Sequence, residues 1–138
     1  MSADDRRRDA AAVATIRAAL LGVQAVSLFG STVTGTSTPG SDLDLAILCP
    51  RSLDPLLRFG LQERLASTLG RPVDLVDVRA ASPVMAMQVV ATGRLLLDAD
   101  PEARGLFEDR TLGAYARLNE ERRGILQRIA TEGTVYGR

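Results

Sequence analysis

Three aspartates are the residues of this sequence best suited to chemistry. Asp42 and Asp44 open the apolar run DLDLAIL, and Asp74 interrupts the apolar run VDLV. Side chains of a strand alternate between its two faces, so Asp42 and Asp44 would project from one face with Cα atoms about 7 Å apart. Two carboxylates aimed at one place repel each other unless a cation lies between them. The pair indicates a metal site, and Asp74 from another strand would complete it.

The third carboxylate is Asp74 or Asp77, which lie three residues apart in the same apolar segment. In a regular strand these two side chains point to opposite faces, so both cannot reach one site. An acid inside an apolar run is costly to bury without a metal or a partner, which favours Asp74 as the ligand.

Magnesium is the cation that fits these acids, because it prefers carboxylate and phosphate oxygens. Two such ions about 4 Å apart can hold the attacking and leaving oxygens of a phosphoryl group. Gly30-Ser31 follows the apolar run AVSLF directly. A helical turn there would offer free backbone N–H groups to phosphate oxygens, and the serine hydroxyl would add a donor. We therefore predict a triphosphate cradle that faces a metal site.

Each feature alone also has a structural explanation. With Ser41 in front of it, the Asp-Leu-Asp segment can be a turn or a helix cap, Gly-Ser pairs are common in loops, and Asp74 can be an acid at a strand edge. The combination favours a site: a strand that ends in Gly-Ser, a polar loop, a strand that opens with Asp-x-Asp, and a later strand that carries an acid.

Composition excludes several classes of protein. The chain has 138 residues, enough for one domain with a core of its own. It has no histidine and one cysteine, Cys49, which excludes catalytic triads with histidine, histidine-bound zinc and CxxC redox chemistry. Its formal net charge of zero argues against broad nucleic-acid binding. No apolar stretch has the length of a signal peptide or a membrane span, so we expect a cytoplasmic protein.

Predicted strands and helices alternate along the chain. Short apolar runs predict strands, and helical spacing or cap signatures such as Asp54-Pro55 and Ser82-Pro83 predict helices. The predicted strands cover residues 25–29, 42–48, 73–78 and 94–97, and the predicted helices cover 9–21, 54–69, 82–93 and about 100–129, the last as one helix or two. This order indicates an α/β layer sandwich, and we expect one domain over 1–138 with a long C-terminal helical segment from about 100.

Gly30-Ser31, ten intervening residues and Asp42-Leu43-Asp44 form the pattern GS-x10-DxD. Over nearly the whole chain, this order resembles the minimal nucleotidyltransferase (MNT) branch of the DNA polymerase β-like nucleotidyltransferase superfamily. The resemblance implies a small mixed sheet flanked by helices, and transfer of AMP from ATP to a hydroxyl group with magnesium bound.

By this resemblance, Asp42, Asp44 and Asp74 bind the metal, Asp74 also helps to deprotonate the acceptor, and Gly30 and Ser31 hold the phosphates. Many MNT proteins are antitoxins that bind a HEPN-domain toxin and inactivate it by adding AMP to a tyrosine. The expected function is therefore that of a protein adenylyltransferase antitoxin. The alternatives are an antitoxin that blocks its partner sterically, and a transferase for a small-molecule hydroxyl such as that of an aminoglycoside.

Two features leave alternatives open. Relatives often carry arginines just after Gly-Ser, in a form like GSRARG, whereas this chain has Thr32-Val33-Thr34 and would need an arginine from elsewhere. The last predicted helix combines an apolar stripe with several arginines, so it can either dock a partner or pack on the core with a solvated face.

Overall fold

The computed structural model of the protein describes residues 1–35 and 41–132. Four strands form one mixed sheet in the order β3-β2-β1-β4. The strand β1 pairs antiparallel with both β2 and β4, and β2 pairs parallel with β3. The strands are β1 (Ala25–Phe29), β2 (Leu43–Leu48), β3 (Val73–Asp77) and β4 (Arg94–Asp98). The helices are α1 (Ala3–Ala19), α2 (Ser31–Thr34), α3 (Pro55–Leu69), α4 (Pro83–Thr92) and α5 (Pro101–Glu132).

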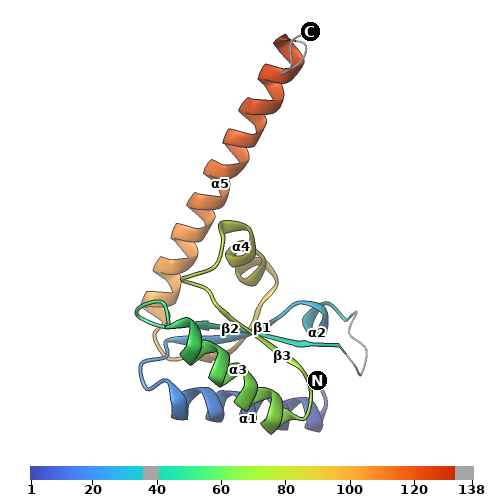
Figure 1. The fold of residues 1–138 in the computed structure, drawn as a ribbon, viewed down its shortest axis with the longest axis vertical. Coiled ribbons are helices and arrows are strands. Elements are labelled where there is room, and N and C mark those ends of the chain that lie inside the picture. The colour runs from blue at the N-terminus through green and yellow to red at the C-terminus, as the bar shows by residue number, and fades with distance from the viewer. Residues whose placement is uncertain (36–40, 133–138) are drawn as a thin grey trace.

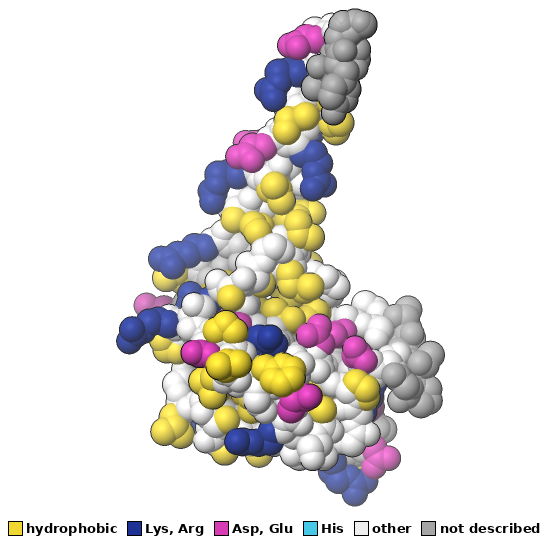
Figure 2. Space-filling model, viewed as in Figure 1, with side chains coloured by type: hydrophobic (Ala, Val, Ile, Leu, Met, Phe, Trp, Pro, Cys, Tyr) yellow, Lys and Arg dark blue, Asp and Glu magenta, His cyan; other side chains and the backbone are white. Residues whose placement is uncertain are grey.

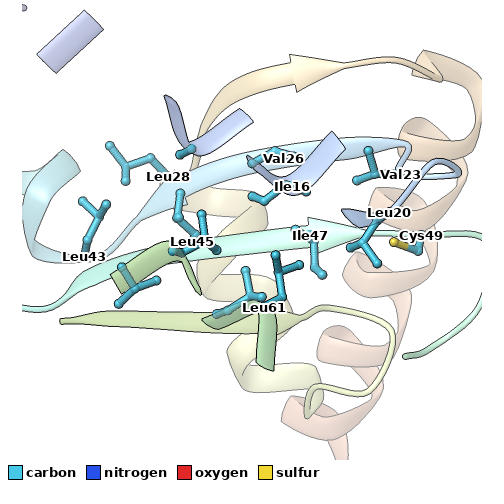
Figure 3. Close-up of a cluster of buried hydrophobic side chains, with 14 residues drawn as sticks. Ile16, Leu20, Val23, Val26, Leu28, Leu43, Leu45, Ile47, Cys49 and Leu61 are labelled. Carbon is cyan, nitrogen blue, oxygen red and sulfur yellow. The ribbon is translucent and has the colours of Figure 1, made fainter. Parts of the chain in front are cut away.

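Helices α1 and α3 cover one face of the sheet, and α4 with the first part of α5 covers the other (Figure 1). The larger core lies under α1 and α3, where alternate residues of β1 and β2 such as Val26, Leu28 and Leu45 meet Ile16 and Leu61 (Figure 3). These strand residues are almost fully buried. Burial of this face fixes the register of the strands, because a slip by one residue would turn every apolar side chain outward.

The second, smaller core lies on the opposite face. It contains Ala46 and Leu48 of β2, Val89 of α4 and the partly buried Phe107 of α5. Asp44 precedes Ala46 by two residues in the same strand, so its side chain belongs to this face of the sheet.

Most predicted strands and helices are confirmed, and the predicted boundaries are most accurate where a capping residue ends a helix. Asp54 caps α3 by accepting from the Leu56 N–H at 2.7 Å, and Gly70 ends the helix with φ of 68°. Ser82 caps α4 by accepting from the Met85 N–H at 3.2 Å. Capping side chains and a left-handed glycine are sequence signals with a direct structural cause.

The predicted start of the first helix is wrong. The helix begins at Ala3 rather than at about Asp9, because Ser2 and Asp5 form a capping box: the Ser2 hydroxyl accepts from the Asp5 N–H, and the Asp5 carboxylate accepts from the Ser2 N–H. This reciprocal bonding satisfies two N–H groups of the helix end and stabilises a first turn that has little apolar character.

The last helix is one continuous element, α5, which projects well beyond the rest of the molecule (Figure 1). Thr111 is its one buried residue in the described part of the chain. None of the helices in the described segments is long and apolar enough to cross a membrane.

Candidate active site

The parallel pairing of β2 with β3 places two of the predicted acids side by side. Asp44 and Asp74 are register partners, so their Cα atoms lie on neighbouring strands and their side chains point to the same face. Asp42 lies directly before β2, two residues from Asp44. Asp42 and Asp74 are exposed and Asp44 is half-buried. The structure thus brings the three carboxylates to one end of the sheet.

The opposite face of the same strands holds these acids in place. Leu43, Leu45 and Ile47 alternate with the acid-bearing positions of β2 and are buried in the larger core, as expected from the sequence. Val73 and Leu75 do the same on either side of Asp74. The acids therefore project from a rigid, anchored pair of strands, which suits groups that must keep a fixed geometry.

The three carboxylates form one electrostatic cluster. Burial raises the pKa of the Asp44 carboxyl above its ordinary value of 3.8, and the negative charges of Asp74 and then Asp42 raise it further. Each of these causes disfavours the ionised form of Asp44. A cation beside the three groups would remove the repulsion and would be bound more tightly for that reason.

Gly30 packs its backbone directly against the Asp44 carboxylate. Its φ is 77°, and a Cβ atom built on it would lie 2.2 Å from Oδ2 of Asp44. Phe29, the residue before it, is the register partner of Asp44 across β1 and β2. Only glycine combines this left-handed conformation with so close an approach.

Ser31 opens the short helix α2 immediately after Gly30. The N–H groups of Val33 and Thr34 donate to the Gly30 carbonyl, each at 3.1 Å, and within the described residues no side chain caps the turn. The first N–H groups of such a turn lack acceptors inside the helix, so they remain available to an anion. The turn predicted at Gly30-Ser31 is thus present and lies beside the acids.

The loop without arginines also has an identifiable structure. Val33 packs against the larger core. The Thr32 hydroxyl is buried and has no hydrogen-bond partner among the residues that the structure describes.

Asp77, the competing acid, has a different environment. Its side chain is buried, and its carboxylate accepts from the Leu53 N–H at 2.6 Å and from the Arg79 N–H at 3.2 Å. Asp77 therefore stabilises the loop before α3 and the turn after β3. Of the two acids, Asp74 is the one that lies beside Asp44.

Arg71 is a residue near the site that sequence patterns did not single out. Its guanidinium Nη2 donates a hydrogen bond of 2.6 Å to the carbonyl of Ser41, the residue directly before Asp42. Its Nε is buried without a partner among the described residues. Arg71 follows Gly70, where α3 ends, and no sequence motif surrounds it. Only the fold shows that Arg71 holds the end of the loop that leads into Asp42.

The donor set fits a hard divalent cation that is shared with phosphate. In the described part of the chain, no three acidic or cysteine side chains lie close enough together to hold a metal ion by themselves. A magnesium ion does not need three protein ligands, because it usually keeps several waters and binds one or two carboxylates together with substrate phosphates. The exposed Asp42 and Asp74 and the half-buried Asp44 suit this open type of site.

The raised pKa of Asp44 predicts a pH effect on stability in the absence of metal. The folded state holds this proton more tightly than the unfolded state, so stability falls as the pH rises from 3.8 through the raised pKa. In EDTA at neutral pH, Asp44→Asn should melt at a higher temperature than the wild type, and the difference should fade as the pH falls toward 3.8.

Thermal melts across this pH range measure the effect, with Asp109→Asn, a change at an exposed acid of α5, as the control. A lower melting temperature of Asp44→Asn at neutral pH would show that the Asp44 carboxylate stabilises the fold instead.

Comparison with known proteins places this geometry in a family. Residues 15–102 match the family model described as polymerase beta, nucleotidyltransferase. The protein adenylyltransferase MntA of Shewanella oneidensis is 39% identical over 107 residues, which cover 78% of this chain and 76% of that relative.

Solved structures agree. A chain in the crystal structure of a toxin–antitoxin with AMP-PNP has a TM-score of 0.78 and 33% identity, and the match covers 94% of this chain and 99% of that one. A chain in the structure of the tri-AMPylated Shewanella oneidensis HEPN toxin in complex with MNT antitoxin has a TM-score of 0.75 and 32% identity, with 90% of this chain and 97% of that one covered. The mixed sheet with its helices is therefore the fold of these proteins.

Proposed function

Because this chain belongs to the polymerase β-type nucleotidyltransferase family, we propose that it transfers AMP from ATP to a tyrosine hydroxyl of a partner HEPN toxin and thereby acts as an antitoxin. One observation carries the proposal. Asp44 and Asp74 are register partners on adjacent strands, with Asp42 beside them and the Gly30 turn packed against Asp44. We propose that the whole chain serves as one nucleotidyltransferase domain, with α5 as its extension.

The relatives support the choice of reaction and partner. One is a protein adenylyltransferase, one was solved with an ATP analogue, and one was solved with an AMPylated HEPN toxin. ATP is accordingly the nucleotide substrate that we propose. We also propose a cytoplasmic location, where ATP and a HEPN toxin would meet the protein.

Asp42, Asp44 and Asp74 would hold magnesium, which when bound neutralises charge on the phosphates and so makes the α-phosphate easier to attack. The turn at Gly30 and Ser31 would bind the outer phosphates through its free N–H groups. Their role is to hold the triphosphate so that its α-phosphate lies beside the acids.

The protein's groups then move one proton. The phenol oxygen of the acceptor attacks the α-phosphorus, the bond from that phosphorus to the bridging oxygen breaks, and pyrophosphate leaves with the electron pair. A phenol has a pKa of about 10, so it needs a base at neutral pH. We assign the base to Asp74, which is exposed and therefore within reach of a docked side chain.

A second candidate, an antitoxin that only blocks its partner, is favoured by one observation. The loop after Gly30 has Thr32, Val33 and Thr34 and hence no arginine to contact a phosphate. The acids that catalysis needs are all present at one end of the sheet, so we place transfer ahead of steric block.

Asp74→Asn and Asp77→Asn should have opposite effects. Without the proposed base and ligand at Asp74, AMP transfer should fall by at least about 100-fold, while stability stays near that of the wild type because the side chain is exposed. Asp77→Asn weakens two bonds to backbone N–H groups, so it should lower the free energy of unfolding by about 1–3 kcal/mol and leave most of the transfer.

Transfer of labelled AMP to the toxin and urea unfolding measure the two effects. Full transfer by Asp74→Asn together with loss in Asp77→Asn would mean that the proposed set of acids is wrong.

A further inference from the structure

The second half of α5 projects from the body as a single helix (Figure 1). Phe107 of α5 packs against the smaller core and Thr111 is buried, so the first half of the helix is packed on the body. We call residues 115–132 the arm. At 1.5 Å per residue it extends about 27 Å. Most of its side chains are exposed.

The arm carries an apolar stripe, of which the middle residue, Ile125, is exposed and Leu118 and Ile129 are half-buried. Leu118, Ile125 and Ile129 share one side of the helix, because they are spaced by seven and then four residues, with Arg122 between them. Ile125 is 49% exposed and its neighbour Leu126 is 58% exposed. Figure 2 shows hydrophobic side chains along the projecting helix, between basic ones.

An arm of this composition is only marginally stable alone. In proteins most helical stability comes from packing of an apolar face rather than from helix propensity. Gly113 and Gly124 weaken the helix further. A partner that covers the stripe would stabilise the arm.

Two observations indicate which partner that is. The match to the nucleotidyltransferase family ends at residue 102, where α5 begins, so the arm lies outside the part that the family shares. The match to the toxin–antitoxin structure covers 94% of this chain, which leaves roughly 8 of 138 residues unmatched, far fewer than the arm contains. A protein solved as part of a toxin–antitoxin pair therefore has most of this arm.

The arm also extends from the face of the sheet that carries the acids. The first half of α5 packs through Phe107 on the sheet face that carries Ala46, and Asp44 belongs to that same face. In Figure 1, α4 and α5 lie on one side of the sheet and α1 and α3 on the other. A protein bound along the arm would stand on the side of the acids.

We infer that the arm is the docking element for the toxin that accepts AMP, and that it binds an apolar surface of that toxin with a carboxylate opposite Arg122. The inference rests on the proposed function, because docking here would bring the acceptor hydroxyl to the acids. The spacing of four, three and four residues from Leu118 to Ile129 suits packing against another helix.

The test compares Ile125→Asp with Gln127→Asp in the full chain, each assayed for affinity to a HEPN-domain toxin. Both variants add one aspartate to the arm, but residue 127 lies about 200° around the helix from residue 125. Loss of a central apolar contact should weaken toxin binding by at least about 30-fold for Ile125→Asp, whereas Gln127→Asp should stay within about threefold. Hydrogen exchange in the arm should slow when the toxin binds to the wild type.

One control and two possible results decide whether the arm docks the toxin. Magnesium and ATP together should raise the melting temperature of Ile125→Asp as much as that of the wild type. An equal rise shows that the fold and the nucleotide site are intact. Equal toxin binding by both variants overturns the docking role. A wild-type chain that sediments as a dimer without toxin, and as a monomer after Ile125→Asp, would assign the stripe to a second copy and also overturns it.

Failure of the proposed function gives a different result. If toxin binding depends on Ile125 but no AMP is ever added to the toxin, the docking role holds and the transfer reaction is wrong. If AMP is added at the wild-type rate by Ile125→Asp with unchanged toxin affinity, the reaction holds and the docking role is wrong.

Discussion

Asp44→Asn is expected to lower AMP transfer to the toxin by about three orders of magnitude. Asp44 is the central acid of the cluster. It lies in register with Asp74, is separated from Asp42 by one residue, and contacts the Gly30 turn. Its neutral replacement removes one charge from the proposed metal site and leaves the strand register unchanged. The measurement is the initial rate of label transfer from ATP to purified toxin.

Binding of the toxin should survive the same change. The acids act on the transferred group and the arm holds the toxin, so Asp44→Asn should co-purify with the toxin as the wild type does. Asp109→Asn removes a charge from an exposed position of α5 and should change neither property. Transfer by Asp44→Asn within tenfold of the wild type would place the chemistry elsewhere on the molecule.

Gly30→Ala is expected to abolish transfer nearly as completely, through geometry instead of charge. The added Cβ would lie 2.2 Å from Oδ2 of Asp44, so either the carboxylate or the turn must move. The residue also has a φ of 77°, which costs a side chain about 1–2 kcal/mol.

Gly35→Ala is the matched control for this substitution. Gly35 has a φ of 81°, but a Cβ atom there would meet none of the described residues within 4 Å. Gly30→Ala should lose more stability in urea unfolding, because its Cβ also meets the Asp44 carboxylate, and only Gly30→Ala should lose transfer. Equal transfer by the two variants would mean that the contact between Gly30 and Asp44 is irrelevant to the reaction.

The sequence predicted the order of strands and helices well because local signals mark many of their ends. The Asp54 and Ser82 caps and the Gly70 stop act within a few residues, so their effect is readable without tertiary contacts. The start of α1 was predicted at about Asp9, too far along the chain. The first turn has no apolar pattern and is stabilised by the Ser2 capping box instead.

The relation of the acids was also predictable in part. Strand parity alone separates Asp74 from Asp77, and the structure shows them in different environments. That Asp74 lies in register with Asp44 is not readable from parity, since it depends on the parallel pairing of β2 with β3, two strands that are joined through α3.

Other features of the site depend on contacts between segments distant in sequence. The bond from Arg71 to the Ser41 carbonyl spans 30 residues. The contact of Gly30 with Asp44 arises only when β1 and β2 pair. Likewise, the pattern of α5 indicated an amphipathic helix but could not distinguish a core-packing face from the partly exposed stripe of the arm.

Addition of AMP to the toxin changes the intact mass of the toxin, which can be measured. The wild-type chain and Asp44→Asn are each co-expressed with the toxin, and the toxin is purified and weighed by mass spectrometry. We expect one or more added AMP units on a toxin tyrosine with the wild type, none with Asp44→Asn, and growth rescued only by the wild type. A toxin of unmodified mass in cells that the wild-type chain rescues would show that no AMP is transferred and would identify this protein as an antitoxin that acts by binding alone.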